Sequence, residues 1–125
     1  MEKYDHFKEF FDKPTYDDLA NIMLRTDEIL TVAEWERIKT EYQFKEGYSR
    51  ARSVNWHRII TGDAVRFAID VINNGGTAKE IRDACIYVRI CVDAEKYSLG
   101  YIQFSKDHHL VDIKEKYGLT YRTIK

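Results

Sequence analysis

The sequence predicts an all-α protein, a compact single-domain bundle of five to seven helices spanning residues 1–125. Over most of the chain, apolar residues recur every three or four positions, which is the period of an amphipathic helix. Two capping boxes, Thr31 with Glu34 and Thr77 with Glu80, mark helix starts. The chain has one Pro and six Gly, too few for the many turns of a β-sandwich or barrel.

The first half of the chain carries three expected helices. Residues 2–12 form a short one that Pro14 ends, and Thr15 begins a second. The third starts after Thr31 and is expected to close near Gly47. Its inward face is expected to consist of Val32, Trp35, Ile38 and Tyr42.

In the second half, one helical face runs from about Ser53 to Asn74. Gly62 lies inside that pattern, as a tolerated residue or as a break with Thr61 capping a new helix. The Asn-Asn-Gly-Gly run at 73–76 is the clearest stop in the chain. After it, a helix is expected over about 78–97. Its middle, Ala84 to Val92, is apolar on nearly every side except at Arg89, which predicts a buried central helix.

The sequence pattern determines the secondary structure of three segments near the C-terminus less clearly. Residues 86–92 are rich in strand formers, although the preceding capping box favours a helix. Residues 101–104 allow one short strand or an extended crossover, and a last helix is expected over roughly 106–117. Gly118 ends that helix.

The best candidate binding surface is an acid-free tract from Gly47 to Gly62. Arginine forks onto carboxylate or phosphate with paired hydrogen bonds, and tyrosine offers a rigid contact face. The predicted binding residues are Tyr48, Arg50, Arg52, His57 and Arg58. In the alternative interpretation, Trp56 belongs to the core and Glu41, Glu46 or Asp63 neutralise the arginines.

Residues 110–125 resemble a helix-turn-helix, with Gly118 at the turn and Ile124 facing inward. The resemblance implies a DNA reader. Lys114 departs from the pattern because a small residue normally stands there, and the chain stops at Lys125. The alternative is a helix followed by a docked tail. Secondary binding candidates in this region are Lys116, Tyr121, Arg122 and Lys125.

Chemistry beyond binding has little support in the sequence. The His108-His109 pair with Asp107 and Asp112 offers too few ligands for a metal site, so neither metal nor cofactor is expected. Spacing predicts no catalytic motif, and the protein is expected not to be an enzyme. Cys85 and Cys91 are expected to be buried, reduced thiols, which together with the lack of an apolar membrane span indicates a cytoplasmic protein.

These observations predict a small non-catalytic protein that regulates a macromolecular partner through its surface. The net charge of −1 provides no general attraction for nucleic acid, so any such binding should be weak, and a protein partner is favoured. Exposed tyrosines at positions 48, 97, 101 and 121 would suit such an interface. The small size and general character of the chain suggest an inhibitor of the kind that phages direct at host nucleic-acid enzymes or defence systems. The alternatives are a DNA-binding transcriptional regulator that uses residues 110–125, and a homodimer.

Overall fold

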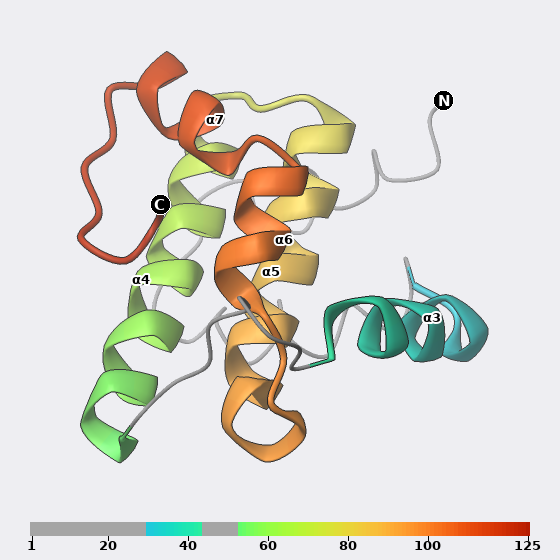
Figure 1. Cartoon of the computed structure of the whole chain (residues 1–125). Helices are drawn as coiled ribbons and strands as arrows, with labels where there is room; N and C mark the ends of the chain where they lie inside the picture. The colour runs from blue at the N-terminus through green and yellow to red at the C-terminus, as the bar shows by residue number, and fades with distance from the viewer. Residues whose placement is uncertain (1–29, 44–52) are drawn as a thin grey trace.

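The computed structural model describes residues 30–43 and 53–125, and in them the fold is all-α. Five helices occur there, and the predicted bundle is confirmed (Figure 1). They are α3 (Val32–Tyr42), α4 (Val54–Asn73), α5 (Ala78–Tyr97), α6 (Tyr101–Asp107) and α7 (Leu110–Lys116). The helices expected over residues 2–12 and after Thr15 lie outside the described residues.

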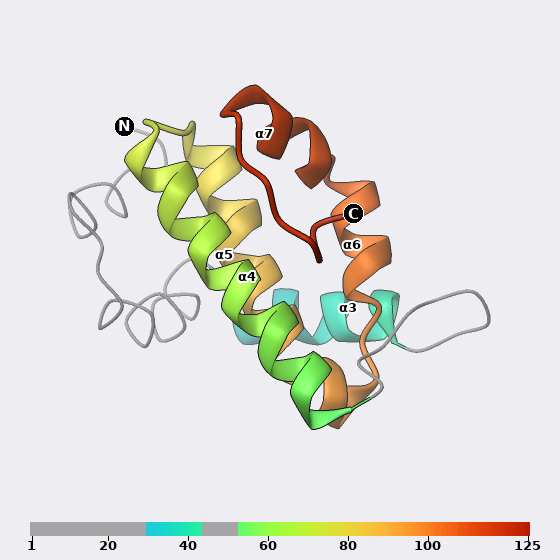
Figure 2. The ribbon, with the colours of Figure 1, turned by 90° about the vertical axis from the view of Figure 1, so that its left-hand side faces the viewer.

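The centre of the bundle is a hairpin in which α4 and α5 lie side by side (Figures 1 and 2). Its turn includes Gly75, whose φ of 72° is in the left-handed region. At Gly76 the backbone passes so close to Val71 that a Cβ would lie 2.8 Å from the Val71 carbonyl oxygen. α4 runs through Gly62 without a break.

The predicted buried central helix over residues 78–97 is confirmed as α5. Thr77 and Glu80 form both hydrogen bonds of the capping box. Ile86, Tyr87 and Val88 are fully enclosed by the neighbouring elements, and the strand alternative for residues 86–92 is wrong. Cys85 and Cys91 are buried free thiols, as expected.

The structure corrects two expectations for residues 101–117. These are the short strand at 101–104 and the single helix over 106–117. The first segment is helix α6, because Tyr101 and Phe104 reach the core at helical spacing. His109, with a φ of 56°, interrupts the helix, so α7 begins only at Leu110. Burial of these side chains outweighs the strand propensity of the segment.

Helix α3 lies across the bundle rather than along it (Figures 1 and 2). The hydroxyl of Thr31 accepts from the Glu34 amide at 3.1 Å, which confirms the predicted start. The helix ends at Tyr42 rather than near Gly47, because Tyr42 O accepts from Gly100 N at 2.7 Å and Gln43 pairs with Leu99 in an isolated bridge.

The last residues form a docked tail, not the second helix of a helix-turn-helix. After Gly118 the chain is non-helical and returns along α4 (Figure 2). Thr123 and Ile124 are buried, and the Thr123 hydroxyl donates to Asp63 at 2.8 Å. Lys114 Nζ donates to the carbonyl oxygen of Ile124 at 2.8 Å. The DNA-reading alternative therefore lacks the helix on which it depended.

Candidate functional site

Three of the five predicted binding residues, Tyr48, Arg50 and Arg52, lie outside the described residues. The other two, His57 and Arg58, are in the first turns of α4. His57 faces α5, with Nε2 2.9 Å from Val92 O and Nδ1 3.7 Å from the carboxylate of Glu95. Arg58 is exposed. Of these two residues, His57 thus joins two helices, whereas Arg58 faces outward.

Trp56 also belongs to the packing, as the alternative interpretation held. Its indole N–H donates to the hydroxyl of Tyr101 at 3.0 Å. The Arg122 guanidinium lies 5.5 Å from the centre of the Trp56 ring. Tyr101 is buried, so the expectation that it is exposed was wrong.

The secondary candidates near the C-terminus are mostly engaged with α4 and α5. Lys116 Nζ donates to Glu80 at 3.0 Å, and the Tyr121 hydroxyl donates to Asp70. Burial, reinforced by that bond to Asp70, raises the pKa of Tyr121. Arg122 lies over Trp56 as described above, while Lys125 is exposed. These contacts serve to attach the tail.

One open feature of the described region is a groove between α3 and the C-terminal half of α5. Its main part has a volume of about 560 Å³, and a smaller pocket of about 140 Å³ adjoins it. The two share Glu36, Lys39 and Tyr97, so they form one continuous depression along α3. We call this depression the α3–α5 groove.

The floor of the α3–α5 groove is aromatic. Trp35 is 7% exposed, and the Arg89 guanidinium lies 4.7 Å from the centre of its ring. Asp93 Oδ2 is 4.0 Å from Arg89 Nε. Burial raises the pKa of the Asp93 carboxyl, with Arg89 opposing the shift. The charges on the floor are therefore close together and partly withdrawn from water.

Two exposed apolar side chains line the walls of the groove. Val32 is 80% exposed and Tyr97 is 38% exposed. They are two of the four large hydrophobic residues that the structure describes as exposed. Scattered single exposed apolar residues are ordinary, but here two of them line the same groove as a buried tryptophan.

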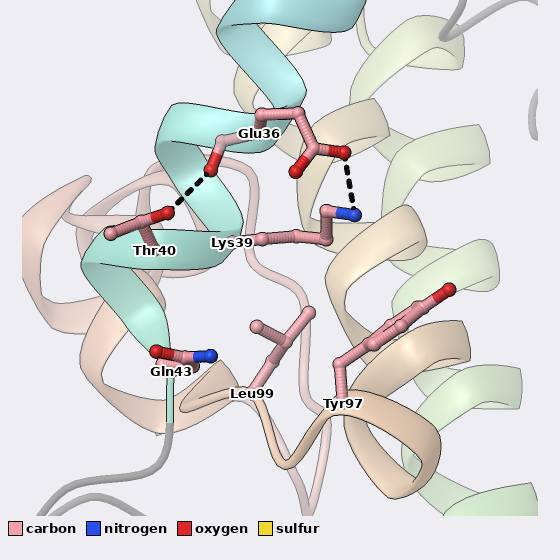
Figure 3. Close-up of a pocket in the computed structure, with 6 residues that line it drawn as sticks. All are labelled: Glu36, Lys39, Thr40, Gln43, Tyr97 and Leu99. Carbon is pink, nitrogen blue, oxygen red and sulfur yellow. Dashed lines mark hydrogen bonds and ion pairs between the residues drawn. The ribbon is translucent and has the colours of Figure 1, made fainter.

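Figure 3 shows the smaller pocket at the far end of the groove, around Leu99. Lys39 extends across it, and its ammonium lies 2.7 Å from the Glu36 carboxylate. Tyr97 stands on the opposite wall. Lys39 Nζ is 4.9 Å from the centre of the Tyr97 ring, and Lys96 Nζ is 5.0 Å from it.

A second depression, of about 320 Å³, lies on the other side of α3 between Arg37, Ile38, Arg82, Phe104 and His108. His108 stacks on Phe104 with ring centres 4.1 Å apart, and its Nδ1 is 3.7 Å from buried Asp83. Burial opposes ionisation of Asp83, but hydrogen bonds from His108 and Lys79 outweigh it and lower the pKa. Residues 30–43 and 53–125 contain no group of three or more side chains that could hold a metal ion.

Sequence reasoning missed the α3–α5 groove, although part of its signal was present. Arg89, Asp93 and Tyr97 are four residues apart and therefore share one face of α5. Tyr97 was correctly expected to be exposed. Val32 was expected to face inward, which is wrong, because α3 crosses the bundle and buries only Trp35 and Tyr42.

Comparison of the chain with protein-family models, with curated proteins and with solved structures finds no match. Among the helices of the described residues, none has the length and apolar character required to cross a membrane. The function must therefore be inferred from the chemistry of the surface.

Proposed function

We propose that this protein is a non-catalytic regulator that holds a segment of a partner protein in the α3–α5 groove. The observation that carries the proposal is the pairing of two exposed apolar walls, Val32 and Tyr97, with the aromatic floor at Trp35. Aromatic residues and arginine are enriched at the centres of protein interfaces, where they contribute most of the binding free energy.

The dimensions of the groove suit an extended peptide segment. α3 has 11 residues, and a rise of about 1.5 Å per residue makes it about 16 Å long. An extended chain advances about 3.3 Å per residue, so a segment of about five residues would span the groove. The walls supply apolar contact along this length, and the edges supply charged groups.

The sequence adds further parts to this proposal. Buried free thiols at Cys85 and Cys91 favour a reducing compartment, so we place the protein in the cytoplasm. An inhibitor of a host nucleic-acid enzyme or defence system, of the kind phages produce, remains one candidate role for such a regulator. The partner in that case would present the bound segment on its own surface.

Two valine variants test the proposal with a matched control. Val32 and Val54 are both exposed, and each is the first residue of a helix behind a hydroxyl cap. An aspartate at either position gains the same favourable interaction with the helix dipole, so Val32→Asp and Val54→Asp should both fold. Only Val32 lines the groove.

The measurement is affinity capture of partners from the native cell, quantified by mass spectrometry, with a photoreactive residue placed at Tyr97. We expect Val32→Asp to lower recovery of the cross-linked partner at least tenfold and Val54→Asp to leave it unchanged. If both variants retain the partner equally, the groove is not the contact surface. A cross-link to nucleic acid instead of protein would also refute the proposal.

A further inference from the structure

We infer that the α3–α5 groove selects a segment that carries an apolar side chain and, three residues further along the chain, a carboxylate. This inference rests on the proposed function and names the chemistry of the segment that the groove takes. It comes from the different character of the two ends of the groove, one apolar and one cationic.

The apolar end lies at the start of α3. Val32 is almost fully exposed there, and Trp35 forms the floor beside it. A leucine, isoleucine or phenylalanine side chain resting on Val32 would remove apolar surface from water on both partners, whereas Trp35 is already covered. No charge of the peptide needs to be buried at this end.

The cationic end lies around Tyr97, whose ring has two ammonium groups near it. Lys39 and Lys96 both lie within about 5 Å of the ring centre. Lys39 is bonded to Glu36, but an ammonium has three donors and can serve a second carboxylate. Lys96 has no carboxylate within ion-pairing distance among the residues that the structure describes. A carboxylate at the edge of Tyr97 would therefore meet two cations.

Neighbouring acids do not reverse this preference. Glu36 is already held by Lys39 at 2.7 Å, and Asp93 lies beside Arg89. The four charged residues that line the groove, Glu36, Lys39, Arg89 and Asp93, carry no net charge. Lys96 lies outside the lining, beside the Tyr97 ring, and adds one positive charge at that rim. A lysine in the bound segment would face Lys39 and Lys96, which is unfavourable.

The spacing follows from the geometry of α3. Val32 and Lys39 are seven residues apart, which is about 10 Å along the helix axis. Three residues of extended chain cover about the same distance. A segment with the carboxylate next to the apolar residue would be too short to engage both ends.

The test is an NMR titration of the ¹⁵N-labelled full chain with three blocked heptapeptides of glycine and serine. The first carries leucine and, three residues later, glutamate; the second has lysine in place of the glutamate; the third places glutamate next to leucine. We expect the first to shift the amide signals of Val32 and Tyr97 and to bind about fivefold tighter than the other two, as expected for one exposed ion pair.

Lys96→Glu provides the matched reversal, since Lys96 is exposed and its replacement should not disturb the fold. In this variant we expect the preference to change to the lysine peptide. Equal binding of all three peptides in the groove would overturn the spacing and charge rule while leaving the proposed function intact. Absence of shifts at Val32 and Tyr97 with every peptide would overturn the rule as well, and capture with Val32→Asp would then decide the proposed function separately. Displacement of the peptides by a short thymidine oligonucleotide would indicate a nucleic-acid site and would also count against the inference.

Discussion

Replacing Ile124 by alanine should destabilise the whole fold, although Ile124 is the next-to-last residue. Its side chain is 1% exposed, in contact with the core that α4 and α5 build. The change removes three carbons, and at about 0.8 kcal/mol per methylene the lost burial amounts to about 2.4 kcal/mol. We expect a total of about 2–3 kcal/mol, at the low end of the range for such core truncations.

Urea unfolding followed by tryptophan fluorescence and circular dichroism measures this loss as a lower midpoint at constant slope. Thr123→Val provides a second arm. Removing the hydroxyl bonded to buried Asp63 should cost about 1–3 kcal/mol, although the volume is kept. Lys125→Ala is the control, because Lys125 is exposed and its loss should stay within about 0.5 kcal/mol. If Ile124→Ala matches this control, the tail does not dock on α4 in solution.

Two further predictions concern titration. Burial raises the pKa of the Cys85 thiol to about 12. A thiol reagent at neutral pH should therefore label the native protein far more slowly than the urea-unfolded chain. Equal labelling rates would show that α5 opens readily. Burial opposes ionisation of Glu80, but bonds from Thr77 N, Tyr117 and Lys116 outweigh it and hold the pKa below 4.5. Because the folded pKa is the lower one, its contribution to the unfolding free energy is complete above pH 4.5 and is lost as the pH falls through the folded pKa. Glu80→Gln should flatten this acid limb of the stability curve, and an unchanged limb would contradict the assignment.

The elements that could be predicted from sequence are those encoded by neighbouring residues. Thr77 and Glu80 satisfy each other's backbone groups within one turn, so the start of α5 is a local property. The turn at residues 74–77 is local too, because Gly75 accepts a positive φ at little cost. The end of α3 is not local. It is set by the backbone hydrogen bond between Tyr42 and Gly100, which no sequence pattern around Tyr42 predicts.

The candidate site was hard to predict for the same reason. Periodicity indicates which residues of a helix share a face, but not on which side the neighbouring helix lies. Val32 and Trp35 are three apart in one apolar pattern, yet Trp35 lies under Arg89 of α5 and Val32 faces water. The crossing direction of α3 makes this difference. The predicted surface at Tyr48, Arg50 and Arg52 stays a prediction, and the α3–α5 groove is a separate candidate.

Lys114 is the residue that departs from the helix-turn-helix pattern, and in the observed fold it contacts the tail. In a helix-turn-helix, a small residue at this position lets the second helix approach the first. Here the side chain is long, and its ammonium donates to the Ile124 carbonyl oxygen at 2.8 Å. The residue that departs from the motif is thus one of those that hold the tail in its non-helical course. Gly118, with a φ of 66°, turns the chain as the motif requires, but the turn delivers Thr123 and Ile124 to the core beside α4 instead of forming a helix for DNA.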